Sequence, residues 1–148
     1  MVRLLSAERK LQTWLQGRGF TVRFAHKCAD EVDFDRRLVS INASSSASSR
    51  VSALLHECGH VLIWRSRCEN HARRVCGRSL EERLLEKGRG RKRTSARRLA
   101  VLQEEVEAWD RGWALRGRLR VRANQKSYER IRSSCLTSYV KWAALSKA

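Results

Sequence analysis

The hydrophobic positions near the start of the 148-residue chain repeat with the period of a helix. Such spacing places the apolar side chains on one face of the helix. The apolar positions with this spacing are Leu4, Leu5, Leu11, Trp14 and Leu15. Gly17 comes directly after this segment, and glycine is a common signal for the end of a helix. The pattern predicts an amphipathic helix over Val2–Gln16.

Two short segments that follow have the alternating, β-branched pattern of strands. They cover Phe20–Ala25 and Arg37–Asn42, and a further strand between them would contain Val32 and Phe34. These segments predict a small sheet of two or three strands in the N-terminal part of the chain.

The rest of the chain is predicted to be mainly helical. The serines of Ala43–Ser49 are suitable N-caps for a helix over Ser48–Arg65. Glycines and basic residues indicate a loop over Arg65–Arg98. A second stripe with helical spacing predicts a helix over Ser95–Arg116, and a last helix is expected over Asn124–Leu145. The members of that stripe, taken as its buried side, are Leu99, Leu102, Val106, Trp109 and Trp113.

The order of the predicted elements is helix, small sheet, helix, basic loop, helix and helix, which is typical of an α+β fold. With 148 residues, 42% of them hydrophobic, the chain can build one compact core and is short for two. We therefore expect a single domain over residues 1–148.

The chain carries a net charge of +17, far more than solubility requires, and this excess suggests an anionic partner. Most of the charge lies in Arg65–Arg98 and in the C-terminal region from Arg111 onward. Nucleic acid or an acidic protein would suit these regions. The basic loop has no interleaved aromatic residues for stacking on single strands, and the chain shows no base-reading motif.

Two further features bear on the cellular compartment. The longest apolar run is Val61–Trp64, so we expect neither a membrane span nor a signal peptide. The five cysteines are widely spaced and form no C-x-x-C pair, which favours a reduced, cytoplasmic setting over a disulfide framework.

The residues His56, Glu57 and His60 form an H-E-x-x-H motif inside the helix predicted over Ser48–Arg65. Histidines four residues apart share a helix face and can offer two imidazole nitrogens to one metal ion, while the glutamate can reach a water molecule beside it. The helical wheel turns Cys58 toward the core, away from the histidines. The motif predicts a zinc site with the base of a hydrolase.

A catalytic zinc site needs a third protein ligand, and the sequence offers two choices. One is the cluster Glu104, Glu105 and Glu107, of which Glu105 lies nearest the predicted buried stripe and Glu104 points almost the opposite way. The other is His71, in the basic loop.

The motif HECGH with a downstream helical E-x-x-A-W resembles the gluzincin metallopeptidases, in particular the thermolysin-type and small ImmA/IrrE-like enzymes. The resemblance spans about Arg37 to Leu115 and implies a zincin-like α+β fold: a small N-terminal sheet, an active-site helix, a glutamate-bearing helix and a C-terminal helix. It implies zinc held by His56, His60 and Glu105, with Glu57 as catalytic base in the hydrolysis of a protein or peptide substrate.

The same resemblance has consequences for neighbouring residues. Arg37–Asn42 would be the edge strand along which the substrate lies. Trp109 stands where the family often has Asn or Asp, so Asp110 is the expected partner of the His56 imidazole. The developing oxyanion requires a further donor, for which Tyr128, Tyr139 and His71 are the candidates.

Two alternatives stay open. A SprT-like, DNA-associated protease would use His71 as third ligand, although its surroundings, NHARRV, fit that pattern poorly. A basic nucleic-acid-binding or structural protein on an inert zincin scaffold would have no use for Glu57 beside the ligand pair.

Overall fold

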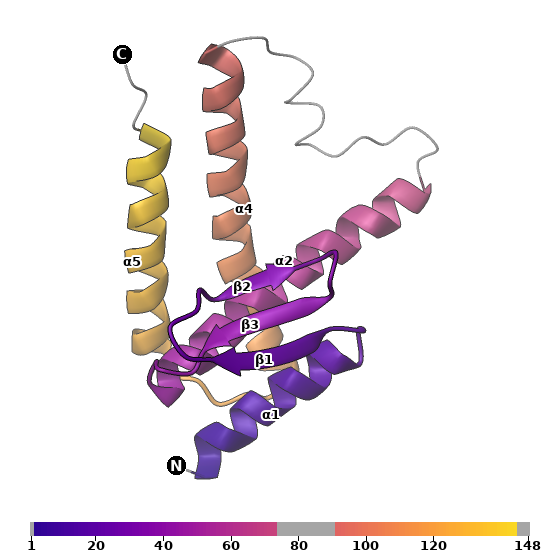
Figure 1. The fold of residues 1–148 in the computed structure, drawn as a ribbon, viewed down its shortest axis with the longest axis vertical. Helices are drawn as coiled ribbons and strands as arrows, with labels where there is room; N and C mark the ends of the chain where they lie inside the picture. The colour runs from indigo at the N-terminus through magenta and orange to yellow at the C-terminus, as the bar shows by residue number, and fades with distance from the viewer. Residues whose placement is uncertain (1, 74–90, 145–148) are drawn as a thin grey trace.

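The computed structural model describes the backbone of residues 2–73 and 91–144, which form an α+β arrangement of four helices and a three-stranded sheet (Figure 1). The elements are α1 (Val2–Gln16), β1 (Thr21–Ala25), β2 (Glu31–Asp33), β3 (Leu38–Asn42), α2 (Ala47–Arg73), α4 (Arg91–Arg118) and α5 (Gln125–Ala144). Each of them overlaps an element predicted from the sequence pattern.

The sheet has the order β1-β3-β2, with β3 parallel to β1 and antiparallel to β2. The expectation that Arg37–Asn42 is an edge strand is therefore wrong, because β3 is paired on both sides. Its centre, from Val39 to Ile41, is buried, as expected for a strand with two neighbours. The edges of the sheet are β1 and β2.

Helix α2 is longer than predicted. It continues to Arg73 instead of ending near Arg65, since the residues after Trp64 include neither glycine nor proline before Gly77. Helix α4 likewise begins at Arg91 rather than Ser95. The remainder of the predicted basic loop, residues 74–90, lies outside the described residues, as does Leu145.

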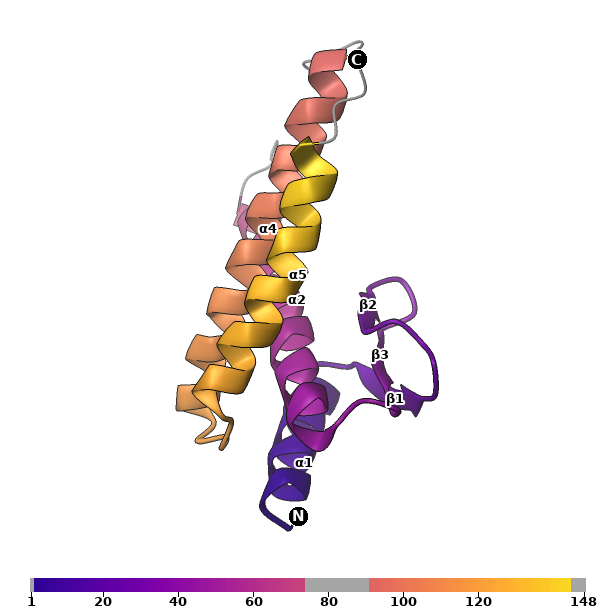
Figure 2. The same ribbon diagram turned by 90° about the vertical axis from the view of Figure 1, so that its left-hand side faces the viewer.

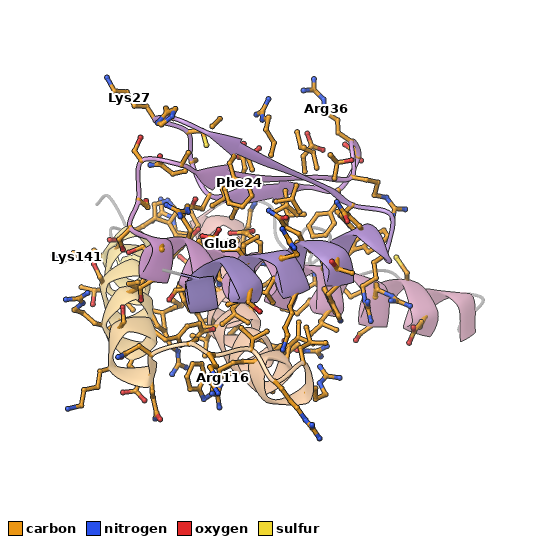
Figure 3. The ribbon with its side chains drawn as sticks, turned by 90° about the horizontal axis from the view of Figure 1, so that it is seen from below. Glu8, Phe24, Lys27, Arg36, Arg116 and Lys141 are labelled. Carbon is orange, nitrogen blue, oxygen red and sulfur yellow. The ribbon has the colours of Figure 1, made fainter. Side chains whose placement is uncertain are left out.

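Helix α2 is the centre of the molecule. The sheet lies on one side of it and the α4–α5 pair on the other, while α1 packs against α2 and β1 (Figure 2). Phe24 points from the sheet toward the helices (Figure 3). The largest fully buried side chains come from α1, β3, α2, α4 and the α1–β1 connection and include Leu11, Leu15, Phe20, Ile41, Leu54, Leu55 and Leu115.

Helices α2 and α4 touch through their backbones. A Cβ atom added at Gly59 would lie 1.9 Å from the carbonyl oxygen of Ala108, and one added at Gly112 would lie 2.2 Å from that of Leu55. Only glycine fits such a crossing. This contact brings the middle of α4 directly onto the H-E-x-x-H segment of α2.

The observed buried face of α4 at this crossing differs from the stripe predicted from the sequence. Leu99, assigned to that stripe, is 54% exposed, whereas Glu105 and Ala108 are buried. Trp109, another member of the predicted stripe, is buried, and the observed buried face of α4 combines it with the small residues Ala108 and Gly112 and with Leu115. Among the described helices, none is long and apolar enough to cross a membrane.

Candidate metal centre

The two histidines of the motif lie one turn apart on α2 and face each other. Their rings are 4.6 Å apart between centroids, and the Nε2 atoms of His56 and His60 are separated by 3.2 Å. Both residues are partly buried. The helix thus directs two imidazole nitrogens toward one point, as the i, i+4 spacing predicted.

Glu105 of α4 completes this group. One carboxylate oxygen lies 3.2 Å from His56 Nε2, and the other lies 3.4 Å from His60 Nε2. Ligand atoms of these three residues all lie within 4.8 Å of one another, and in the described part of the chain they form a group able to hold a metal ion. Ligands about 2.0–2.1 Å from a tetrahedral zinc ion are about 3.3 Å apart. The observed separations fit zinc.

Contacts among His56, His60 and Glu105 shift the pKa values of these three side chains. Burial disfavours the carboxylate of Glu105, but hydrogen bonds to His56 and His60 and the charge of His60 lower its pKa to about 2. Burial also disfavours the charged form of His60, yet its hydrogen bonds to Glu104 and Glu105 raise its pKa to about 10. Burial lowers the pKa of His56. In the metal-free protein these contacts favour the ionised form of Glu105 and the protonated form of His60.

Glu57 is buried, 3% exposed, beside the histidine pair. Burial is the main reason that its pKa is raised to about 8, and the charge of Glu105 adds to the shift while that of His60 opposes it. A carboxyl group with this pKa can both accept and release a proton near neutral pH. A divalent cation at the histidines would favour its ionised form.

A cavity of about 350 Å³ opens beside the group. His56, Glu57 and Glu105 lie in its wall, and α5 supplies Ile131, Cys135 and Tyr139. The remaining lining residues are Asp30, Ser45, Ser49, Ala53 and Trp109. The candidate base Glu57 and two of the three candidate ligands, His56 and Glu105, therefore face a cavity whose wall is partly apolar, which is the usual composition of a small ligand site.

Glu104 has a place that the sequence pattern did not predict. One of its oxygens lies 3.6 Å from Nδ1 of His60, and the other accepts a hydrogen bond of 2.7 Å from Arg67. The helical wheel had turned Glu104 away because the stripe was centred on the large apolar residues. A stripe centred on Ala108 and Gly112 would have turned it toward α2.

Trp109 takes the position expected for a polar partner of His56. Its ring stacks on the imidazole with centroids 4.3 Å apart, and His56 Nδ1 is buried without a hydrogen-bond partner among the described residues. Asp110 does not contact His56. Its exposed carboxylate instead pairs with Arg132 of α5, with 2.8 Å between Oδ1 and a guanidinium nitrogen.

The three candidates for the oxyanion donor occupy different places. Tyr139 lines the cavity; burial, the charge of Glu105 and a hydrogen bond to Glu105 raise its pKa to about 12. Tyr128 is buried and donates a 2.6 Å hydrogen bond to the carbonyl oxygen of Trp109, so its hydroxyl is engaged in holding α5 to α4.

His71 belongs to α2 and not to a loop, and its side chain lies outside the described residues. Eleven residues of continuous helix separate its backbone from that of His60 by about 16 Å. The third member of the observed group is Glu105.

Changing all five cysteines to serine, or to alanine at buried Cys58, should leave metal binding intact in a variant that folds. In the described part of the chain, the metal-binding group contains no cysteine, and Cys58 is fully buried in the core as predicted. Elemental analysis of the folded variant tests this. Loss of metal from a correctly folded protein would contradict the histidine and glutamate ligand set.

Comparisons of the chain with protein-family models, curated proteins and solved structures found no match.

Proposed function

We propose that the protein is a zinc-dependent peptidase. The observation that carries the proposal is the convergence of His56, His60 and Glu105 from two helices, with donor separations of 3.2 to 3.4 Å, beside the buried carboxyl group of Glu57. A purely structural metal site has no need for a buried, unpaired acid in the wall of a cavity.

In the proposed reaction zinc would act as the Lewis acid, and the protein would transfer the protons. Zinc held by three protein ligands supplies a Lewis acid that lowers the pKa of water and polarises a carbonyl group. Glu57 accepts the proton of the attacking water and passes it to the leaving amine. Burial raises its pKa to about 8 in the metal-free protein, and a bound cation would lower that value toward the neutral range, which suits a group that acts first as base and then as acid.

We assign the remaining oxyanion donor to Tyr139. Its hydroxyl reaches Glu105 and lines the same cavity, whereas that of Tyr128 is bound to a backbone carbonyl. A hydrogen bond to the carbonyl oxygen that becomes negative in the transition state would lower the barrier to hydrolysis.

The substrate is proposed to enter along β2 rather than β3. Strand β2 pairs with β3 on one side only, and Asp30, the residue just before it, lines the cavity. An edge strand offers backbone donors and acceptors to an extended peptide. This favours a protein or peptide substrate in an extended conformation.

The test of the proposal is the Glu57→Gln variant. The amide keeps the shape of the side chain but cannot accept the proton, so cleavage of a peptide library should fall about a hundredfold or more while the zinc content stays unchanged. Elemental analysis and mass spectrometry of the cleavage products measure the two quantities. Equal cleavage by the variant and the parent, or a parent that binds no zinc, would overturn the proposal.

The two tyrosines of α5 provide a matched pair. Tyr139→Phe should lower kcat by about a hundredfold with little change in KM or in zinc affinity, because it removes a donor used in the transition state. Tyr128→Phe should leave kcat unchanged and lower the free energy of unfolding by about 1 kcal/mol, through its lost hydrogen bond to Trp109. Steady-state kinetics and urea denaturation separate the two. The reverse pattern would show that the donor is misassigned.

A further inference from the structure

A band of cations follows the edge of the molecule formed by α1 and the α4–α5 connection. Its members are exposed or partly exposed basic side chains, here called the cationic edge: Arg9, Lys10, Arg18, Arg118, Arg120 and Arg122. They come from two segments that are more than ninety positions apart in sequence. Figure 3 shows this side of the molecule from below, with Arg116 labelled at the end of α4.

Contacts between the two segments make the edge continuous. Lys10 Nζ donates a hydrogen bond of 3.1 Å to the backbone carbonyl of Arg120, and a shallow hollow beside it is lined by Lys10, Arg120 and Arg122. A second hollow, of about 440 Å³, lies between the same two segments, with Arg9 and Lys10 beside Thr13, Trp14 and Leu119 in its wall. The cations therefore border one surface.

Little negative charge compensates this surface. Among the described residues, none of its six cations forms an ion pair with a carboxylate. The nearby acids are engaged elsewhere, since Glu8 pairs with Arg50 and Asp110 with Arg132. Burial and the charges of Arg65 and Arg118 lower the pKa of Arg18, which means that these arginines repel one another.

The backbone holds one of these cations in a position that favours glycine. Arg120 has a φ of 49° at the end of α4, where its amide bonds the carbonyl of Gly117. The left-handed conformation is unfavourable for any residue with a Cβ atom. The exposed side chain of Arg120 lines the hollow beside Lys10.

We propose that the cationic edge binds the phosphate backbone of nucleic acid. Guanidinium groups match phosphate oxygens in a two-pronged hydrogen-bonding geometry, and a band of them from several elements suits a repeating chain of phosphates. Trp14 lines the second hollow, but it is only 8% exposed and the guanidinium of Arg18 lies over its ring, which leaves little of that ring to stack on bases. Recognition would thus be independent of sequence.

This binding surface is separate from the proposed peptidase site. None of its six residues lines the cavity beside His56 and Glu105. Nucleic acid on the cationic edge would leave that cavity open, and would hold the protein near proteins that share the same nucleic acid. The proposal does not depend on zinc or on hydrolysis.

The test compares two variants of the full-length protein with equal loss of charge. In the first, Arg118, Arg120 and Arg122 are changed to Gln; because all three are exposed, the core is untouched. In the control, Lys27, Arg36 and Lys141 are changed to Gln, and Figure 3 shows Lys27 and Arg36 on the sheet, across the molecule from Arg116. Circular dichroism verifies that both variants fold.

Binding to a short DNA duplex and to an RNA duplex is measured by fluorescence anisotropy over a range of salt concentrations. Parent affinity should fall steeply with salt, since each phosphate contact contributes about 0.9 to the slope of log K against log salt. The first variant should lose about 2 to 3 of that slope and on the order of a hundredfold in affinity near ~0.1 M salt. The control should stay within about threefold of the parent.

The proposal would be overturned if the parent showed no salt-dependent binding, or if the control variant lost as much affinity for the duplexes as the first variant. It would also be overturned if poly-glutamate bound as tightly as either duplex. The same holds if affinity were lost only in a variant in which Arg91, Lys92 and Arg93 are changed. Poly-glutamate binding would identify an acidic protein as the partner, and the last result would assign binding to the start of α4. Binding to only one of the two duplexes would support the proposal that the cationic edge binds nucleic acid, and would show whether that nucleic acid is DNA or RNA.

Discussion

Replacing Glu105 with alanine should lower the affinity of the protein for zinc by more than about a hundredfold. Loss of an outer partner of a zinc ligand typically costs ten- to a hundredfold, and Glu105 is proposed as a ligand itself. Its carboxylate lies 3.2 Å from His56 Nε2 and 3.4 Å from His60 Nε2, so the alanine variant leaves only two protein donors. Chelator competition on folded protein measures the loss.

The neighbouring glutamates of α4 provide graded controls. Glu104→Ala should cost about tenfold, because Glu104 lies 3.6 Å from Nδ1 of His60 and orients that ring rather than binding the metal. Glu107→Ala should cost almost nothing, since its half-exposed side chain pairs with Arg111. Zinc affinity that is unaffected by Glu105→Ala, or lost in Glu107→Ala, would contradict the proposed ligand set.

The position of Glu104 beside His60 was not predicted from the sequence. From the pattern alone, Glu104 is a surface carboxylate whose loss costs little, and the structure revises this. Helix periodicity identifies α4 correctly but leaves its rotation open, because Leu99, Trp109 and their spacing fit several phases of the same helix. The phase is fixed by backbone contact at Ala108 and Gly112, which a scale of side-chain hydrophobicity does not register.

The parts predicted well are those fixed by local physics. The i, i+4 spacing of His56 and His60 alone brings their Nε2 atoms together, and the wheel placed Cys58 in the core. The wheel of α4 selected Glu105 from the acidic cluster, and the family resemblance grouped it with the two histidines, while His71 stayed open as an alternative. Glu105 was the glutamate nearest the predicted stripe and lies on the observed buried face, so the error in the stripe did not change its assignment.

The parts predicted poorly depend on long-range pairing. The residues of Leu38–Asn42 do not indicate whether this strand has one neighbour or two. Strand β3 is central because it pairs with β2 as an antiparallel strand and with β1 as a parallel strand. Asp110 was expected beside His56 from a family pattern. Its ion pair with Arg132 requires α5 to pack against α4, which cannot be deduced from the residues around the motif.

Replacing Gly59 with alanine should lower the free energy of unfolding by more than about 3 kcal/mol. The added Cβ would stand 1.9 Å from the carbonyl oxygen of Ala108, and this atom belongs to the backbone of α4 and cannot rotate away. Helices α2 and α4 would have to move apart along their whole contact. Urea denaturation followed by circular dichroism measures the loss.

Gly117→Ala is the matched control, because it makes the same chemical change in a helix where no atom lies within 4 Å of the new Cβ. It should stabilise the protein by up to about 1 kcal/mol, the difference in helix propensity between the two residues. Equal stability of the two variants would mean that α2 and α4 are not in backbone contact.

The Gly59 variant also tests whether the metal site depends on the helix crossing. If part of the Gly59→Ala protein remains folded, the separation of the helices should carry Glu105 away from His56 and His60, which stay on α2. Zinc affinity should then fall as it does in Glu105→Ala, although all three ligands are present. Full zinc affinity in a destabilised Gly59→Ala protein would show that Glu105 is not held at the site by this crossing.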